Sequence, residues 1–219
     1  MKIHHLAAKP SILQHFLAEI RDENIQKDRM RFRRNIERIG EILAYELSHA
    51  LAYTNVNIQT PLGTKKSPVL KDDIVICSVL RAGLPLHQGI LNYFDKAPSA
   101  FISAYRKHKD GGEVFNIEVE YLASPSLEGK ILLLADPMLA TGKSFVSVLE
   151  ALKPLGIPKE IHLVSVIGAK EGIEYTSKNL PKDAHLWIAD IDETLNNYGY
   201  IIPGLGDAGD LAFGEKLQH

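Results

Sequence analysis

Residues 132–145 read LLLADPMLATGKSF, an apolar run followed by a loop that ends in Gly142-Lys143-Ser144. The same ending closes the phosphate-binding loop of ATP- and GTP-hydrolysing enzymes, but that loop needs a glycine at the position that Pro137 occupies here. Proline has a fixed φ and no N–H to donate to a phosphate. The stretch therefore predicts a strand, a loop and a helix that serve some other phosphate ligand.

The end of this loop predicts a small anion site. Thr141 to Ser144 open the next helix, and a helix start offers unpaired N–H groups and the positive end of the helix dipole to one phosphate group. Asp136, at the end of the apolar strand, is placed to accept hydrogen bonds from sugar hydroxyls. Asp136 and Thr141 are equally explained as ordinary turn and capping residues, so both interpretations stand at this point.

The apolar pattern along the chain alternates between the two-residue period of strands and the longer period of helices. Strands are predicted at 73–79, 99–105, 130–135, 161–167 and 185–190. Helices are predicted at 28–53 and near 85–94, 143–153 and 170–180. Because strands that alternate with helices form a parallel sheet, we expect an α/β fold with a doubly wound, mainly parallel sheet flanked by helices. One domain over 1–219 accounts for this pattern, with an N-terminal helical segment at 1–55.

A hairpin interrupts the alternation. Between the second and third predicted strands the sequence reads YRKHKDGGEVFNIEVEYL, in which the turn Asp110-Gly111-Gly112 joins two extended stretches. We expect an exposed arm over residues 105–121 that moves as a lid and shields the site when ligand binds.

The composition excludes several classes of protein. The 219 residues are 45% hydrophobic, ample for a buried core, and the net charge of −2 gives no general attraction to nucleic acid or to an anionic membrane. The start, MKIHHLAAKP, lacks the apolar core of a signal peptide, and the longest solid apolar run, residues 131–135, is far shorter than a membrane span. The one cysteine, Cys77, lies in the apolar run DIVICSVL, where an inert core position is expected. We therefore expect a cytoplasmic protein with neither nucleic acid nor a membrane as partner.

The helix predicted at 28–53 combines one apolar face with a basic remainder. Its basic residues are Arg29, Arg31, Arg33, Arg34 and Arg38. We interpret these arginines as solvated charge around the apolar face, and a site for an effector anion is the alternative.

Two more segments follow predicted strands at the edge where doubly wound sheets bind ligands. The first is LRAGLPLHQG at 80–89, a strand-to-helix turn with Arg81 and Gly83. The second is the tail NNYGYIIPGLGDAGDLAFGE, in which glycines bracket Pro203 and two aspartates. A plain turn-rich tail is one interpretation. The alternation of apolar anchors with glycines favours a loop, over 190–214, that presents main-chain N–H and C=O groups to the edge of a small heterocycle.

At these residues the sequence resembles the uracil phosphoribosyltransferases. LRAGLPLHQG at 80–89 is similar to the family's pyrophosphate-side turn, and AYRK at 104–107 is similar to the stretch that carries its second arginine. DPMLATGKS at 136–144 resembles its phosphoribosyl diphosphate loop, and GYIIPGLGDAGD at 199–210 resembles its uracil loop. Pro137 stands where many other phosphoribosyltransferases carry a second acid, and Lys143 replaces the second glycine of the usual ATGGS.

The resemblance implies transfer of phosphoribose from 5-phosphoribosyl 1-diphosphate to N1 of uracil, which gives uridine monophosphate (UMP) and pyrophosphate, with Mg2+ bridging the diphosphate. It implies catalytic roles for Arg81, Arg106, Asp136 and Asp207. The donor would be bound by Arg81, Arg106, Asp136, Pro137, Met138, Leu139, Ala140, Thr141, Gly142, Lys143, Ser144 and Asp207. Uracil would be bound by Ile201, Gly206, Asp207 and Ala208, and Asp207 would also reach the metal through water. The resemblance further implies a homodimer or higher homo-oligomer and, as in some relatives, GTP as an effector.

Three alternatives stand beside this interpretation. A sibling transferase that uses another base would need a different base loop. A nucleotide-sensing regulatory protein would keep the fold, but retention of the four catalytic residues together speaks against it. A metal protein is suggested by the nine histidines, yet His4-His5 is an isolated terminal pair and the others lack ligand spacing. No side chain stands out as an obligatory base for N1 of uracil.

Overall fold

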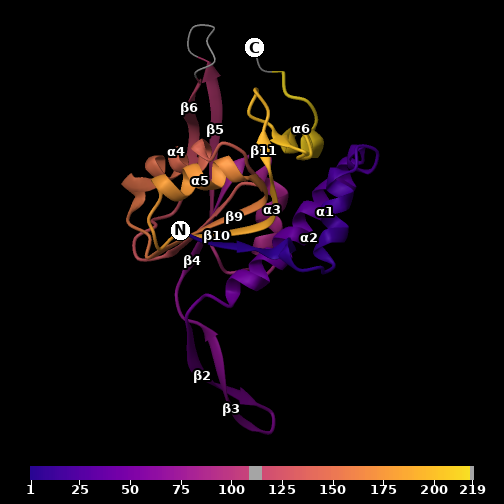
Figure 1. Cartoon of the computed structure of the whole chain (residues 1–219). Coiled ribbons are helices and arrows are strands. Elements are labelled where there is room, and N and C mark those ends of the chain that lie inside the picture. Colours follow the sequence, from indigo (N-terminus) through magenta and orange to yellow (C-terminus); the bar gives the residue numbers. More distant parts are fainter. Residues whose placement is uncertain (109–114, 218–219) are drawn as a thin grey trace.

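The structure, a computed structural model, describes residues 1–108 and 115–217 and is built around one large sheet (Figure 1). In the described residues this sheet has eight strands in the order β1-β10-β9-β7-β4-β5-β6, with β8 paired to β9. Their bounds are β1 Lys2–His5, β4 Ile74–Leu80, β5 Ser99–His108, β6 Phe115–Ala123, β7 Ile131–Ala135, β8 Met138–Leu139, β9 Glu160–Ala169 and β10 His185–Asp192. The described neighbours are parallel except for β5 and β6.

Helices cover both faces of this sheet (Figure 1). One face carries α1 Leu13–Arg21, α2 Arg29–Ser48 and α3 Gly83–Leu91, and the other carries α4 Lys143–Leu152 and α5 Lys170–Asn179. The strand β7, ILLLA, is buried along its whole length. Its Leu133 packs towards the first layer of helices, whereas Leu132 and Leu134 pack towards the second. The predicted doubly wound, mainly parallel sheet is confirmed.

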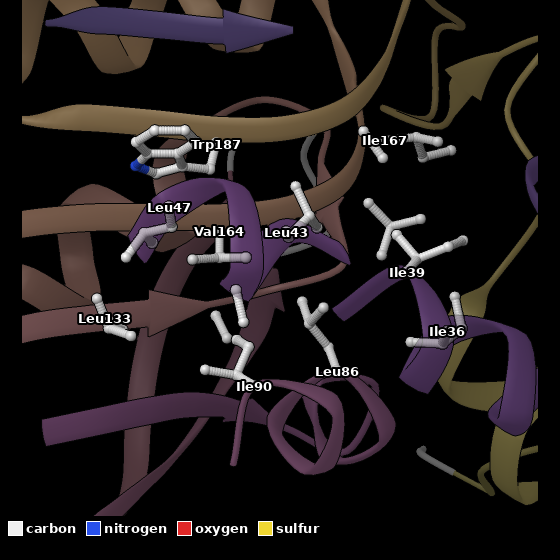
Figure 2. Packing of buried hydrophobic residues seen from close by; sticks show 14 of the residues in the cluster. Ile36, Ile39, Leu43, Leu47, Leu86, Ile90, Leu133, Val164, Ile167 and Trp187 are labelled. Atoms are coloured by element: carbon white, nitrogen blue, oxygen red, sulfur yellow. The ribbon is translucent and has the colours of Figure 1, made fainter. Parts of the chain in front are cut away.

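The larger core lies under α2 and α3. Figure 2 shows Ile36, Ile39, Leu43 and Leu47 of α2 and Leu86 and Ile90 of α3 packed with Leu133, Val164, Ile167 and Trp187 of the sheet. The α2 residues recur every three or four positions, so they share one face of the helix. The apolar face predicted for this helix is confirmed.

The helix predicted at 28–53 ends early, at Ser48. After the turn at 49–52, the chain forms β2 Tyr53–Thr60, which pairs antiparallel with β3 Gly63–Leu70 as a hairpin that stands away from the sheet (Figure 1). The sequence of β2, YTNVNIQT, contains the threonine, valine, isoleucine and tyrosine residues that favour strands. The predicted end of the helix was therefore wrong by five residues, of which only Tyr53 belongs to β2.

The arginines of α2 contact other parts of the protein. Arg31 Nε donates to Glu19 Oε2 at 2.8 Å, and Arg33 Nη1 donates to the carbonyl of Ala212 at 2.6 Å. Arg31 remains 49% exposed, so the interpretation as solvated charge stands for it, whereas this interpretation is wrong for Arg33, which binds the main chain at Ala212. The partner of Arg33 lies far away in the sequence, so the local pattern could not indicate it.

Several elements beyond the predicted set complete the chain. In addition to α1 and β1, they are β11 Thr194–Leu195, β12 Ile201–Ile202, α6 Ala208–Phe213 and the 3-10 helices η1 Leu6–Ala8, η2 Ile25–Lys27 and η3 Lys153–Leu155. Among residues 1–108 and 115–217, no helix combines the length and the apolar character needed to cross a membrane.

The strands β5 and β6 form the hairpin predicted at 105–121, with Tyr105 opposite Glu118 and His108 opposite Phe115. The predicted turn at 110–112 lies outside the described residues. The expectation that this arm moves as a lid stays a prediction.

The N-terminal histidines are not isolated, in contrast to the expectation from the sequence. Because β1 pairs in parallel with β10, the His4 ring stacks on Trp187 with 3.6 Å between ring centroids, and His4 Nε2 lies 3.2 Å from His185 Nδ1. Burial, together with the neighbouring His185, lowers the pKa of His4 to about 4. In the part of the chain that the structure describes, no group of three or more histidine, cysteine or acidic side chains could hold a metal ion.

Cys77 lies in β4 with none of its surface exposed. Burial raises the pKa of its thiol to about 12, so the thiolate is not populated at neutral pH. The predicted inert core position is confirmed.

We predict that Gly89→Ala lowers the free energy of unfolding by about 1 to 3 kcal/mol, the usual range for overpacking. An added Cβ at Gly89 of α3 would lie 2.1 Å from the carbonyl oxygen of Glu37 in α2. Helix propensity alone would favour alanine by up to about 1 kcal/mol. A net loss of stability would therefore show that the close contact between α2 and α3 outweighs this gain. Urea unfolding measures the change, and Gln88→Ala, exposed on the same helix, is the matched control. An unchanged or raised midpoint for Gly89→Ala would show that the helices can separate freely.

Candidate active site

A cavity of about 210 Å³ lies where β4 and β7 end and the C-terminal residues fold back over them. Three segments that the sequence predicted separately meet in its lining: the turn after β4, the loop after β7 and the C-terminal loop. The predicted site residues in the lining are Arg81, Asp136, Met138, Ala140, Ser144, Ile201, Gly206, Asp207 and Ala208. The carboxyl edge of a parallel sheet is where such sites are expected.

Asp136 follows the last residue of β7 and is only 9% exposed. Its Oδ1 accepts a hydrogen bond from the Met138 N–H at 3.2 Å, and its carbonyl accepts one from the Ser165 hydroxyl of β9. These contacts hold the carboxylate at the rim of the cavity. The ordinary turn role is therefore present, and Asp136 lies in the lining of the cavity.

Gly142 gives the loop after β7 the left-handed conformation that its turn requires. Its φ is 75°, and an added Cβ would lie 2.3 Å from Thr176 Oγ1. Lys143 follows as the first residue of α4, where the unpaired N–H groups of the helix begin. Lys143, which replaces the second glycine of the usual ATGGS, therefore lies at a helical position. The left-handed conformation belongs to Gly142, which is retained.

Some predicted donor-binding residues lie beside the cavity and do not line it. Leu139 is fully buried in the core, and the carbonyl of Pro137 accepts hydrogen bonds from two N–H groups of β9 at 3.1 and 3.0 Å. Thr141, Gly142 and Lys143 form the turn next to the lining residue Ser144 and are absent from the described lining. The Thr141 hydroxyl also accepts from the Lys143 N–H at 3.4 Å.

Arg81 lines the cavity and contacts the C-terminal residues. Its Nη2 donates to Asp210 Oδ1 at 3.0 Å and to the Gly214 carbonyl at 3.2 Å. The second predicted arginine, Arg106, lies in β5 opposite Ile117 of β6, and its side chain lies outside the described residues. The structure therefore places one of the two predicted guanidinium groups.

The C-terminal loop brings main chain to the cavity. Gly204 and Gly206 have φ angles of 60° and 95°, in the left-handed region that glycine adopts without strain. Ile201 before these glycines and Ala208 after them both line the cavity. A loop that presents main-chain groups, as the sequence predicted, is consistent with this path.

Asp207 caps the start of α6. Its Oδ1 accepts from the Asp210 N–H at 2.9 Å, and Lys216 Nζ lies 3.3 Å from its Oδ2. Burial alone would raise the pKa of Asp207, but the Asp210 N–H and the Lys216 ammonium outweigh it and the pKa is lowered. An added Cβ at Gly209 would lie 3.2 Å from Asp207 Oδ1, closer than most Cβ contacts, so this glycine leaves room for the Asp207 carboxylate.

Sequence reasoning missed Lys216 as a lining residue. It lies beyond the predicted base loop, and only the return of the tail over the sheet brings its ammonium to Asp207. Tyr200, which precedes Ile201 and was not among the predicted uracil-binding residues, also lines the cavity and is 47% exposed. Its position within GYIIPG, in the stretch that resembles the uracil loop, could have indicated this place in the lining.

Comparisons with known proteins agree with this arrangement. The family model described as Uracil phosphoribosyltransferase matches residues 7–215. A protein named Uracil phosphoribosyltransferase from Porphyromonas gingivalis is 49% identical over 217 residues, which cover 99% of this chain and 100% of that protein. A protein of the same name from Methanococcus vannielii is 39% identical over 198 residues, which cover 89% of this chain and 84% of that protein.

One solved structure is similar along almost the whole chain. The AQ2163 protein from Aquifex aeolicus matches with a TM-score of 0.85 and 30% sequence identity, covering 99% of this chain and 100% of that one. Because the family model and these relatives extend over nearly all residues, the likeness includes the sheet, both helical layers and the lining of the cavity. The chain belongs to the uracil phosphoribosyltransferase family.

Proposed function

We propose that this chain transfers the phosphoribosyl group of 5-phosphoribosyl 1-diphosphate to N1 of uracil and releases UMP and pyrophosphate. The reaction is a pentosyl transfer of pyrimidine salvage. One observation carries the proposal: Arg81, Asp136 and the main chain of the C-terminal loop line the same cavity. A cation for diphosphate, a carboxylate for ribose hydroxyls and main chain for a flat base are the three groups that this reaction needs.

The reaction separates charge, and this determines what the protein must supply. As the bond between C1 of the ribose and the leaving diphosphate lengthens, positive charge grows on the sugar and negative charge on the diphosphate. Countercharge fixed in advance is therefore the main catalytic requirement. Arg81 would provide it, because a guanidinium makes forked contacts with phosphate oxygens. Arg106 would add a second guanidinium, and main chain at 140–144 would bind the 5-phosphate.

Donor binding involves an exchange at Arg81. The guanidinium of Arg81 is bound to Asp210 Oδ1 and the Gly214 carbonyl in this structure. Diphosphate oxygens would replace these two acceptors, and Asp136 would accept hydrogen bonds from the ribose hydroxyls. The exchange would link donor binding to the position of α6, which carries Asp210.

The residues of the cavity fit Mg2+. In sites that bind phosphates, Mg2+ keeps several waters and is bound through one or two carboxylates and the substrate. Asp136 and Asp207 both line the cavity, and the lowered pKa keeps Asp207 ionised at neutral pH. Among the described residues no group of three or more histidine, cysteine or acidic side chains could hold the ion, so diphosphate and water would supply most of its ligands. When bound, Mg2+ would neutralise charge on the diphosphate, with Asp207 reaching it through water.

Uracil would be recognised mainly by main chain. Its edge presents an acceptor, a donor and an acceptor, and the N–H and C=O groups of Ile201, Gly206 and Ala208 can complement that order. Main-chain groups have no side-chain rotamers to fix on binding, which favours a precise fit to a planar ring. Asp207 would contact the nucleotide from the same loop.

Other parts of the proposal rest on the family resemblance. They are a cytoplasmic location, a homodimer or higher homo-oligomer, and GTP as an effector. The relatives compared are named as transferases, so they give no support to a regulatory protein that binds nucleotides without turnover.

We predict that uracil is used and cytosine is rejected, because cytosine reverses donor and acceptor at two positions of the recognised edge. Each buried mismatch costs about 1 to 3 kcal/mol, so kcat/KM should fall by about 30-fold or more. Pyrophosphate release from the donor, Mg2+ and each base in turn measures the difference. Comparable turnover of cytosine would contradict the assignment of the base, and donor binding without turnover of any base would favour the regulatory alternative.

We predict that Asp136→Asn lowers kcat/KM by about tenfold to a hundredfold, because it removes the charge that binds the ribose hydroxyls. The asparagine oxygen can still accept the Met138 N–H, so the melting temperature should stay close to that of the unchanged protein. The exposed Asp95, changed to asparagine, is the control. If stability and activity fell together in Asp136→Asn, the residue would be structural.

We predict that Lys143→Gly keeps kcat, since α4 begins at this position and the required main-chain N–H groups remain. The donor KM of Lys143→Gly and Lys143→Ala, measured across ionic strengths, tests the side chain. A rise in KM that shrinks with added salt would indicate attraction between the ammonium and the 5-phosphate. Loss of kcat in both variants would contradict the proposed role of this loop.

A further inference from the structure

The loop between Ile201 and Gly206 is held by side chains from outside the cavity. Arg21, the last residue of α1, donates from Nη1 to the Gly204 carbonyl at 2.9 Å and to Asp192 Oδ2 at 2.8 Å. Asp192 Oδ2 in turn accepts the Gly204 N–H at 3.3 Å. Both main-chain polar groups of Gly204 therefore bind the same ion pair.

A second side chain holds the next residue of the loop. The amide nitrogen of Gln26 donates to the Ile20 carbonyl of α1 at 3.0 Å and to the Leu205 carbonyl at 2.8 Å. Two consecutive carbonyls of the loop thus receive donors from the region around the end of α1. We call Arg21, Gln26 and Asp192 the loop clamp.

The ion pairs of the loop clamp are largely shielded from water. The side chains of Arg21 and Asp192 are 19% and 7% exposed, and Arg21 Nη2 lies 3.0 Å from Asp190 Oδ2. Both aspartates lie in β10, inside the main sheet. A planar guanidinium that binds two carboxylates of one strand has little freedom to turn. The sheet therefore fixes the arginine, and the arginine fixes Gly204.

The loop is tight at the residue that the clamp holds. Gly204 has a φ of 60°, and an added Cβ would lie 2.1 Å from the Ile201 carbonyl oxygen. Ile201 and Gly206, on either side, line the cavity. A shift of Gly204 would therefore move main-chain groups on both sides, including those proposed to bind the base.

We infer that the loop clamp positions the base-recognition loop and that Arg21 is its central residue. This inference rests on the proposed function and extends it to residues outside the described lining of the cavity. Arg21 is a positioning residue: it acts through Gly204 and Leu205, and it does not contact the substrate. The clamp acts on the base side of the cavity, so binding of uracil should depend on it and binding of the donor should not.

We predict that Arg21→Met raises the KM for uracil about tenfold or more, the factor that corresponds to loss of a charged hydrogen bond, and leaves the KM for the donor within about twofold. Arg21→Lys keeps a positive charge opposite the aspartates but cannot make the fork of contacts, so its KM should be intermediate. Gln26→Leu removes hydrogen bonds without leaving a buried charge unpaired and should raise the KM for uracil by about threefold. This variant keeps the test valid if Arg21→Met folds poorly.

Arg31→Met is the matched control. Arg31 pairs with Glu19 in the same helical layer, and among the described contacts it has none to the base loop. Its two KM values should match those of the unchanged protein. Hydrogen exchange of amides at 201–207 should accelerate in Arg21→Met and not in Arg31→Met. This measurement detects loosening of the loop and does not require turnover.

The outcomes separate this inference from the proposed function. An unchanged KM for uracil in Arg21→Met and Gln26→Leu, with turnover intact, would overturn the role of the clamp and leave the transferase activity standing. Equal rises in both KM values would also overturn it, since they would indicate a general loss of structure. Absence of turnover in the unchanged protein would overturn the proposed function, and the inference with it.

Discussion

Burial of β7 on both faces is the constraint on which the rest of the structure depends. The five residues of this strand are all buried between β4 and β9, so an ionised side chain along its length would be desolvated without a partner. The first carboxylate therefore appears at Asp136, where the chain leaves the sheet. Arg81 follows the end of β4 in the same way. Because the strands are parallel, these groups reach one edge together, and the site forms there.

The sequence predicted the elements that are determined by local patterns of residues. Apolar runs with their periods indicated the core strands and helices, and Asp136, Gly142 and the C-terminal glycines marked turns that the structure contains. The end of the helix at 28–53 was misplaced by five residues, because the helical period does not mark where a helix ends. The sequence also failed where the partner is distant. Lys216 reaches Asp207 only after the tail has folded back.

The base loop shows why part of the site could not be predicted. When a loop recognises a ligand through its main chain, the identities of its side chains do not indicate that ligand. The conformation of such a loop must be maintained by other residues. Here Arg21 and Gln26, near the end of α1, bind the carbonyls of Gly204 and Leu205. No motif links these positions, because a hydrogen bond from a side chain to a main-chain group places no demand on the identity of the accepting residue.

The pairing of Arg81 with Asp210 has a consequence for the role of salt. The protein supplies an internal counterion for the guanidinium that we propose binds diphosphate. Donor binding is then an exchange of one anion for another, and few mobile ions are released to the solution at this residue. Added salt weakens the internal pair as well as the new one, so the two effects partly cancel. The contribution of Arg81 to the ionic-strength dependence of donor affinity should therefore be smaller than its full positive charge suggests.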